Sequence, residues 1–175
     1  MRFERMTTSN HPMYETAMGL YRESFPEHEL REAPSQERIM GQGDYHFDLI
    51  YDGDTFVGLV LSWQTADFIY IEHFCIRPQL RGRRYGQQAL ALVRQPGKTV
   101  ILEIDPPVDA ISIRRKGFYE RCGYRENPYA HVHPPYHRGS HGHDLVIMTC
   151  PEAISSETYN DFAAYLKNTV MKDVF

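Results

Sequence analysis

Residues 68–86, FIYIEHFCIRPQLRGRRYG, join an apolar run to a basic turn that contains glycine, and this junction limits the folds open to the chain. The aromatic and β-branched run predicts a buried strand, and the segment QQALALVRQ that follows predicts a helix. Where a strand enters a helix through a tight loop, the first helical turn presents unpaired N–H groups and the positive end of the helix dipole, which together stabilise a phosphate. The junction therefore predicts a strand, an anion-binding loop and a helix.

Glycine and arginine residues in the predicted loop fit this interpretation. Gly82 and Gly86 have no Cβ to keep a phosphate away from the backbone, and an arginine side chain contacts phosphate oxygens at two points. The basic residues of the turn are Arg77, Arg81, Arg83 and Arg84. The alternative is a solvated basic turn that only joins two core elements, and glycine spacing alone does not separate the two hypotheses.

Composition and length limit the class of protein and the number of domains. With 19 basic and 23 acidic residues the net charge is −4, which argues against a nucleic-acid or acidic-membrane partner and makes the basic turn a local feature suited to one small anion. A chain of 175 residues suits one domain, residues 1–175, in which we expect 151–175 to be a C-terminal helical extension. The oligomeric state stays open and includes a homodimer.

Targeting signals and cysteines indicate the compartment. No stretch approaches the roughly 20 apolar residues of a membrane helix, and the N-terminus MRFERMTTSN lacks the apolar core of a signal peptide. Cys75, Cys122 and Cys150 are odd in number and far apart, so we expect free thiols in a reducing environment. We therefore expect a cytoplasmic protein without a membrane partner.

Hydrophobic periodicity divides the chain into strands and helices. We expect Ser9 or Asn10 to cap a first helix that carries Pro12 in its first turn, and Ser35 to cap a short helix at 36–40. A strand, a helix and a second strand form a parallel crossover, and two alternating runs before them form an antiparallel hairpin. The predicted fold class is α/β (α+β), with a mixed, mainly antiparallel central sheet and helices on both faces. The predicted strands are at 2–7, 47–51, 57–63, 68–76, 99–104 and 144–149, and the later helices are at 85–94, at 111–121 and after Ser155 or Ser156.

The segment RPQLRGRRYGQQAL resembles the pyrophosphate loop of the GNAT superfamily of acyl-CoA-dependent N-acyltransferases, whose pattern is Gln or Arg, two residues, Gly, one residue, then Gly or Ala. Arg84 stands where the family usually has glycine, and it can still offer its backbone N–H if its φ is negative. The segment SIRRKGFYERCGY is similar to a later family motif, in which Tyr119 falls on the general acid and Ser112 on a position that often holds Asn. The resemblance covers most of the chain, from the first strand to Thr149.

The resemblance implies acetyl-CoA as the cosubstrate and a cleft that holds it. In the family the strands at 68–76 and 99–104 splay apart, and unpaired backbone groups of Phe74, Cys75 and Ile76 would bind the pantetheine arm as an added strand does. The other residues expected at the cosubstrate are Arg81, Gly82, Arg83, Arg84, Tyr85, Gly86, Gln87 and Ser112.

Glu72 is the candidate base that takes a proton from the amine. A period of two puts Glu72 on one strand face with Tyr70, Phe74 and Ile76, and it puts a structural His73 on the opposite face. A structural Glu72 that is half of an ion pair is an equal alternative, because a carboxylate in a central strand is costly to bury alone. A water-relayed proton path is compatible with either role.

Three further sites follow from the same reaction. Tyr119 is the candidate acid for the departing thiolate, because a phenol pKa of about 10 is matched to an alkyl thiolate, and a core tyrosine at a helix end is the alternative. A backbone N–H near Cys75 or Ile76 would bind the oxyanion. In the family the loop after the first helix helps to form the acceptor pocket, so Phe25 is a candidate wall of it, and a core aromatic is the alternative.

The segment HVHPPYHRGSHGH crowds histidines together, and paired His-x-His spacing can bind a divalent metal. We expect a flexible surface loop without a metal, because no carboxylate or cysteine stands beside it at a typical ligand spacing. The loop would overhang the acceptor pocket, with Tyr129 and Tyr136 as contacts.

The sequence therefore predicts a cytoplasmic N-acetyltransferase of the GNAT type. It would transfer an acetyl group from acetyl-CoA to a primary amine of a small molecule or peptide, by direct attack in a ternary complex. Two alternatives come from other classes: a non-catalytic acyl-CoA-binding sensor, and a metal-binding interaction protein that uses the histidine-rich segment. The acceptor amine is not specified by the sequence.

Overall fold

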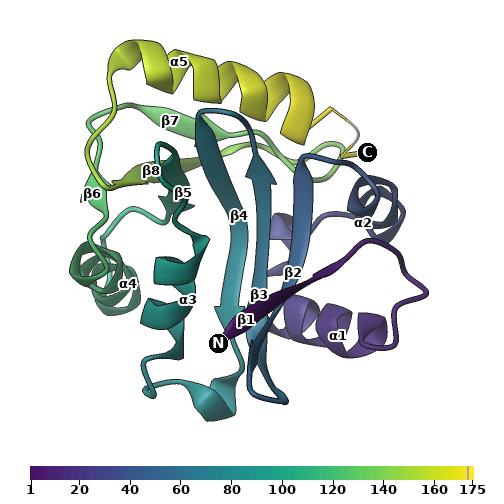
Figure 1. Ribbon diagram of the computed structural model, residues 1–175. Coiled ribbons are helices and arrows are strands. Elements are labelled where there is room, and N and C mark those ends of the chain that lie inside the picture. The colour runs from purple at the N-terminus through teal and green to yellow at the C-terminus, as the bar shows by residue number, and fades with distance from the viewer. Residues whose placement is uncertain (173) are drawn as a thin grey trace.

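The computed structural model describes every residue except 173, and in it a twisted central sheet is covered by helices on both faces (Figure 1). The strand order is β1, β2, β3, β4, β5, β8, β6, with β7 also paired to β8. Among the described strands only β4 and β5 pair in parallel, so the predicted mixed, mainly antiparallel sheet with one parallel crossover is confirmed. The strands are β1 (Arg2–Met6), β2 (Tyr45–Asp52), β3 (Thr55–Gln64), β4 (Phe68–Ile76), β5 (Thr99–Ile104), β6 (Arg125–Glu126), β7 (His131–His133) and β8 (His143–Cys150).

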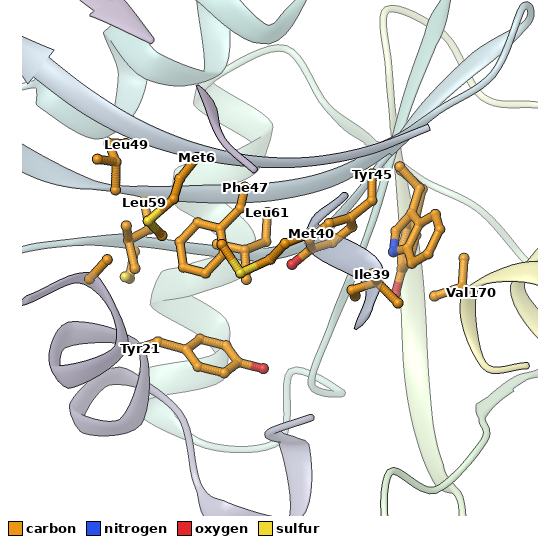
Figure 2. Close-up of a cluster of buried hydrophobic side chains, with 14 of the residues drawn as sticks. Met6, Tyr21, Ile39, Met40, Tyr45, Phe47, Leu49, Leu59, Leu61 and Val170 are labelled. Carbon is orange, nitrogen blue, oxygen red and sulfur yellow. The ribbon is translucent and has the colours of Figure 1, made fainter. Parts of the chain in front are cut away.

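Two hydrophobic clusters, one on each face of the sheet, fix the helices in place. The first joins β1, β2 and β3 to α1, α2 and the C-terminal helix α5, and Figure 2 shows Met6, Tyr21, Ile39 and Val170 among its members. The second joins the opposite sheet face to α3 and α4. The helices are α1 (Tyr14–Ser24), α2 (Ala33–Met40), α3 (Tyr85–Val93), α4 (Ala110–Arg121) and α5 (Ser156–Tyr165), which continues into a π-helical turn, Leu166–Val170. Every helix of the described residues is too short or too polar to span a lipid bilayer.

Some predicted helix starts are wrong. The first helix begins at Tyr14 without a side-chain cap, so neither Ser9 nor Asn10 caps it. The second begins at Ala33, and Ser35 lies inside it, where its hydroxyl accepts a hydrogen bond from Arg31. Both predictions treated a good capping residue as sufficient, although tertiary contacts decide where a short helix starts. The cap of α5 by Ser155 is confirmed by the hydrogen bond from the Thr158 N–H.

A β-bulge interrupts the pairing of β3 with β4. Leu61 pairs with His73 but Ser62 pairs with Ile71, so Glu72 is an extra residue on β4. An extra residue reverses the alternation of side chains beyond it. His73 consequently packs on the ring of Phe25 beside the first cluster, while Phe74 belongs to the second cluster. The expectation that Glu72 and Phe74 share a face and that His73 opposes them is therefore wrong.

The parallel strands β4 and β5 separate part of the way along their length. Their pairing runs from Phe68 and Thr99 to Ile71 and Leu102. Beyond that point β4 continues against β3 alone, as far as Ile76, and β5 continues against β8 alone. The separation leaves one edge of β4 without a strand partner from Glu72 onward.

The end of β4 lies so close to β3 that only glycine fits at position 58. A Cβ added to Gly58 would lie 2.2 Å from the carbonyl oxygen of Cys75. We expect Gly58→Ala to lower the free energy of unfolding by about 2 kcal/mol or more, because a backbone atom must move to relieve the overlap. Urea titration followed by circular dichroism measures the change.

Gly19→Ala is the matched control, because a Cβ there meets no atom within 4 Å. Alanine is the better helix former, so this variant should gain about 0.5–1 kcal/mol. A Gly58→Ala protein as stable as the wild type would show that β3 and β4 do not need this close approach.

Candidate active site

The space between the separated strands is a cavity of about 890 Å³. Its walls come from the end of α1, from β4 and β5, from the loop that enters α3, from α4, and from the segment around β7 and β8. Most of the predicted site residues line it: Phe25, Glu72, Phe74, Cys75, Ile76, Arg81, Gly82, Arg84, Tyr85, Gly86, Gln87, Tyr119 and Tyr136. The fold thus brings together, at one opening of the sheet, residues that are far apart in the sequence.

The loop before α3 turns through two left-handed residues. Gly82 has φ 78°, which glycine adopts freely, and Arg84 has φ 64° at the N-cap of α3. The negative φ that would let Arg84 replace the usual glycine in offering its N–H is therefore not observed. No side chain caps α3, so the first N–H groups of its nine residues are left for another acceptor. A Cβ on Gly86 would lie 3.1 Å from the ring of Phe118, so glycine here also keeps α3 close to α4.

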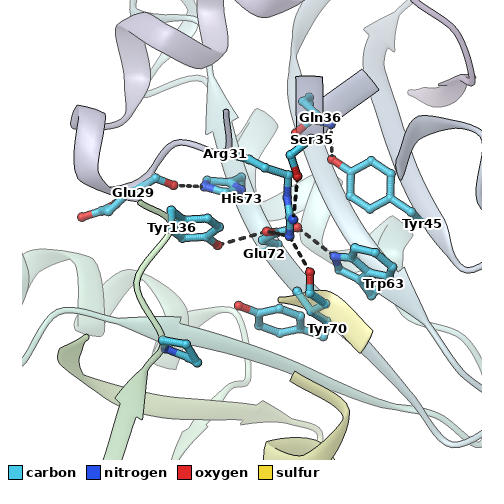
Figure 3. Close-up of polar contacts among 12 residues, drawn as sticks. Glu29, Arg31, Ser35, Gln36, Tyr45, Trp63, Tyr70, Glu72, His73 and Tyr136 are labelled. Atoms are coloured by element: carbon cyan, nitrogen blue, oxygen red, sulfur yellow. Dashed lines mark hydrogen bonds and ion pairs between the residues drawn. The ribbon is translucent and has the colours of Figure 1, made fainter. Parts of the chain in front are cut away.

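Glu72 is held by three donors in the interior of the protein (Figure 3). Arg31 Nη2 donates to its Oε1 at 2.8 Å, Trp63 Nε1 donates to its Oε2 at 2.8 Å, and the Tyr136 hydroxyl donates to Oε1 at 3.0 Å. The Glu72 side chain is only 1% exposed, whereas the residue as a whole is half-buried. The part of Glu72 that reaches the cavity is therefore its main chain at the bulge.

The charges of this ion pair are fixed by their surroundings. Burial opposes ionisation of Glu72, but Arg31, His73 and the hydrogen bond from Trp63 outweigh it and lower the pKa to about 2. Burial likewise disfavours the Arg31 cation, yet Glu72 more than compensates and raises the Arg31 pKa. Glu72 is consequently a carboxylate at any physiological pH and a weak proton acceptor.

A second buried carboxylate lies across the cavity on β5. The hydroxyl of Tyr70 donates to Glu103 at 2.5 Å, His131 Nε2 donates to its other oxygen, and His133 Nε2 lies 3.8 Å away. Burial works against the charge of Glu103, but His133, His131 and Tyr70 overcome it and lower the pKa. Sequence reasoning missed this residue, although a lone acidic residue in the apolar run TVILEI is a usable signal.

Tyr119 lies on α4 and faces the cavity. Burial raises its pKa to about 12. Its ring packs between those of Phe118 and Tyr124, with centroid distances of 5.2 and 5.7 Å. The phenol is therefore held in place, stays protonated, and has a proton to give.

Three predicted residues do not line the cavity. The hydroxyl of Ser112 is used in a capping box with Asp109 at the start of α4. Tyr129 stacks on Tyr159 at 4.2 Å and donates to the carbonyl of Ile154. Arg83 lies in the exposed turn, outside the cavity wall. Local hydrogen bonding and the packing of α5 therefore place the side chains of Ser112 and Tyr129 elsewhere.

The histidine-rich segment is partly built into the sheet. His131 and His133 belong to β7, where they are 5% and 2% exposed, so the expected free surface loop is wrong for this part of the segment. His137 Nε2 donates to the carbonyl of Glu27 at 2.9 Å. Among the described residues no group of three His, Cys, Asp or Glu side chains is arranged to hold a metal ion.

Known proteins resemble this chain in sequence and in fold. The profile of the Acetyltransferase (GNAT) family matches residues 10–124. A structure assigned to the GNAT acetyltransferases, from Bacteroides thetaiotaomicron, is 29% identical, covers 98% of both chains and superposes with a TM-score of 0.91. An aminoglycoside 6′-N-acetyltransferase solved with coenzyme A has a TM-score of 0.57 at 17% identity over 85% of this chain and 96% of that one.

The ribosomal-protein-S18-alanine N-acetyltransferase of Escherichia coli has a TM-score of 0.58 at 15% identity over 89% of this chain and 96% of that one. At such identities the last two structures show a shared fold alone. No protein of curated function matches the chain. The family match spans more than half of the sequence, so the chain belongs to the GNAT acetyltransferase family and is an acyltransferase.

Glu72→Gln should destabilise the protein at neutral pH by roughly 3 kcal/mol, because it leaves the Arg31 cation buried without a counter-ion. The folded-state pKa of Glu72 is about 2 against an ordinary 4.5, so its contribution is complete above pH 4.5 and is lost as the pH falls toward 2. The stability difference between wild type and variant should therefore narrow below pH 4.5. Urea titrations at pH 7 and pH 3 measure it.

Glu152→Gln is the control, since its ion pair with Arg125 is largely exposed and should contribute little at either pH. Equal stability of wild type and Glu72→Gln at pH 7 would contradict the structural importance of the pair.

Arg84→Gly should raise the free energy of unfolding by about 1 kcal/mol, because it removes a non-glycine residue from the left-handed region. Arg83→Gly removes the same charge at a residue whose φ is not positive, so it should give no gain. Thermal unfolding of the wild type and both variants measures the change in stability. If both variants changed stability equally, loop charge and not backbone conformation would be the cause.

Proposed function

We propose that the protein is an N-acetyltransferase that moves an acetyl group from acetyl-CoA to a primary amine of a small molecule or peptide, by direct attack in a ternary complex. The observation that carries the proposal is the separation of β4 from β5, which opens a cavity between the uncapped N-terminus of α3 and the Tyr119 phenol. A protein of the same fold that was solved with coenzyme A, the aminoglycoside 6′-N-acetyltransferase, supports the choice of carrier. The free thiols fit a cytoplasmic location, which we also propose.

The cosubstrate would bind along the unpaired edge of β4. On the β5 side the main chain from Phe74 to Ile76 has no strand partner among the described residues, and its free groups suit the amides of a pantetheine arm. The diphosphate would accept hydrogen bonds from the first turn of α3, helped by Arg84 and by Arg81, whose Nε also donates to the carbonyl of Ile76. Bound in this way, the thioester end would lie beside the bulge.

Acetyl transfer then needs a donor for the oxyanion and an acid for the leaving group. The main chain near Cys75 or Ile76 is our candidate for the donor. Tyr119 gives its proton to the departing thiolate, because its phenol faces the cavity and remains protonated. Glu72 fits the role of an ion-pair anchor better than that of a direct base, since its oxygens are occupied and its pKa is about 2.

The acceptor end of the cavity favours a cationic amine. Glu29, Glu103 and Asp105 line it, and burial together with the charge of Asp105 raises the pKa of Glu29. A cationic acceptor would offset these negative charges. The aromatic rings of Phe25 and Tyr136 form the wall between the carboxylates.

Tyr119→Phe should lower kcat about 10²-fold or more while the KM for acetyl-CoA changes little, because only proton transfer to the thiolate is lost. A thiol-release assay with a panel of primary amines measures turnover, and calorimetry measures acetyl-CoA binding. Tyr14→Phe is the control, as its hydroxyl pairs with Glu37 on the surface. Wild-type turnover by Tyr119→Phe would remove the assigned role, and an absence of thiol release with every amine would remove the proposed function.

A further inference from the structure

The proposed reaction leaves one proton without an acceptor. A primary amine is protonated near neutral pH, with a pKa of about 10 if it resembles lysine, and must lose a proton before it attacks. Both oxygens of Glu72 are engaged by Arg31, Trp63 and Tyr136. The cavity wall also holds the titratable side chains of Glu29, His73 and His143, and within it His133 and Glu103 form a buried pair that can take up a proton.

The hydrogen bonds of His133 determine which of its nitrogens is free. Its Nδ1 lies 2.6 Å from the carbonyl oxygen of Pro134. A carbonyl only accepts, so Nδ1 carries the hydrogen and the neutral ring has its lone pair on Nε2. Nε2 lies 3.4 Å from the Tyr136 hydroxyl and 3.8 Å from Glu103. The basic nitrogen therefore sits between a hydroxyl and a carboxylate.

The Tyr136 hydroxyl has a hydrogen-bond acceptor in both protonation states of His133. Its hydroxyl lies within reach of His133 Nε2 at 3.4 Å and of Glu72 Oε1 at 3.0 Å. It can donate to His133 while the ring is neutral and to Glu72 once Nε2 carries a proton. Glu103, fixed by Tyr70, then faces the imidazolium as a counter-charge.

We propose that His133 is the base that takes the proton from the acceptor ammonium, directly or through one water, and that Glu103 is its positioning residue. The inference rests on the proposed function. The ammonium N–H bond breaks and the proton passes to His133 Nε2; the amine nitrogen bonds to the acetyl carbon as the carbon–sulfur bond breaks. Tyr119 protonates the thiolate and the amine gives its second proton to water, so CoA thiol and the amide are the products.

This role predicts a pH dependence, because only neutral His133 accepts a proton. In the wild type kcat should therefore rise with pH, since a ring that already carries a proton on Nε2 cannot take another. The titratable groups that face His133 are Glu29, His73, Glu103, Tyr136 and His143.

His133→Gln should lower kcat about 10²-fold or more near pH 7, should change the KM for acetyl-CoA less than threefold, and should lose the rise with pH. His133→Ala should regain activity when imidazole is added, which a purely structural residue would not allow. Glu103→Gln should move the rise to lower pH, because the imidazolium loses its counter-charge. His141→Gln, an exposed change in the same segment, should behave as wild type.

Several outcomes would overturn the role of His133. One is a His133→Gln enzyme that keeps the wild-type rate and pH profile, and another is a folded His133→Ala enzyme that imidazole does not activate. If neither variant folds, a wild-type kcat that stays constant between pH 5.5 and pH 8 would also overturn the role of His133. A wild-type protein that releases no thiol with any amine would instead overturn the proposed function.

Discussion

The buried ion pair of Arg31 and Glu72 joins segments that are far apart in the chain. Arg31 precedes α2, Glu72 is the bulged residue of β4, and the Arg31 guanidinium also donates to the carbonyl of Val170 at 2.8 Å, 139 residues away. Both side chains are almost fully buried, which is tolerable because the charges meet at 2.8 Å and the Arg31 Nη atoms also donate to Ser35 and to the carbonyl of Val170. The geometry of the cavity wall at Glu72 therefore depends on its ion pair with Arg31.

The bulge at Glu72 gives β4 two functions at once. Its extra residue turns the Glu72 side chain toward Arg31 and leaves the main chain facing the cavity, and it moves Phe74 to the opposite cluster. Just before it, β4 stops pairing with β5 after Ile71. A strand that changes partners at a bulge can hold a charged side chain in the core and offer free backbone groups to a ligand.

The cavity is lined by two polar systems that meet at one hydroxyl. One system is the ion pair of Arg31 and Glu72, and the other is the group of Tyr70, His131 and His133 around Glu103. Tyr136 contacts both Glu72 and His133. On the opposite wall Tyr119 keeps its proton because burial raises its pKa. Proton uptake and proton donation would thus occur at different sides of one cavity.

The sequence by itself determined the order of β1 to β5 and β8 and of the five helices, the mixed sheet, the turn with glycine and arginine before α3 and the position of Tyr119 on a helix, because hydrophobic periodicity, glycine and charge act over a few residues. The tertiary structure alone decided the bulge, the left-handed Arg84, the capping role of Ser112 and the site of Tyr129. It also decided that Tyr136 reaches Glu72 across 64 residues and that His131 reaches Glu103 across 28. Strand register and such distant contacts depend on which surfaces pack together, and no local pattern of residues contains that information.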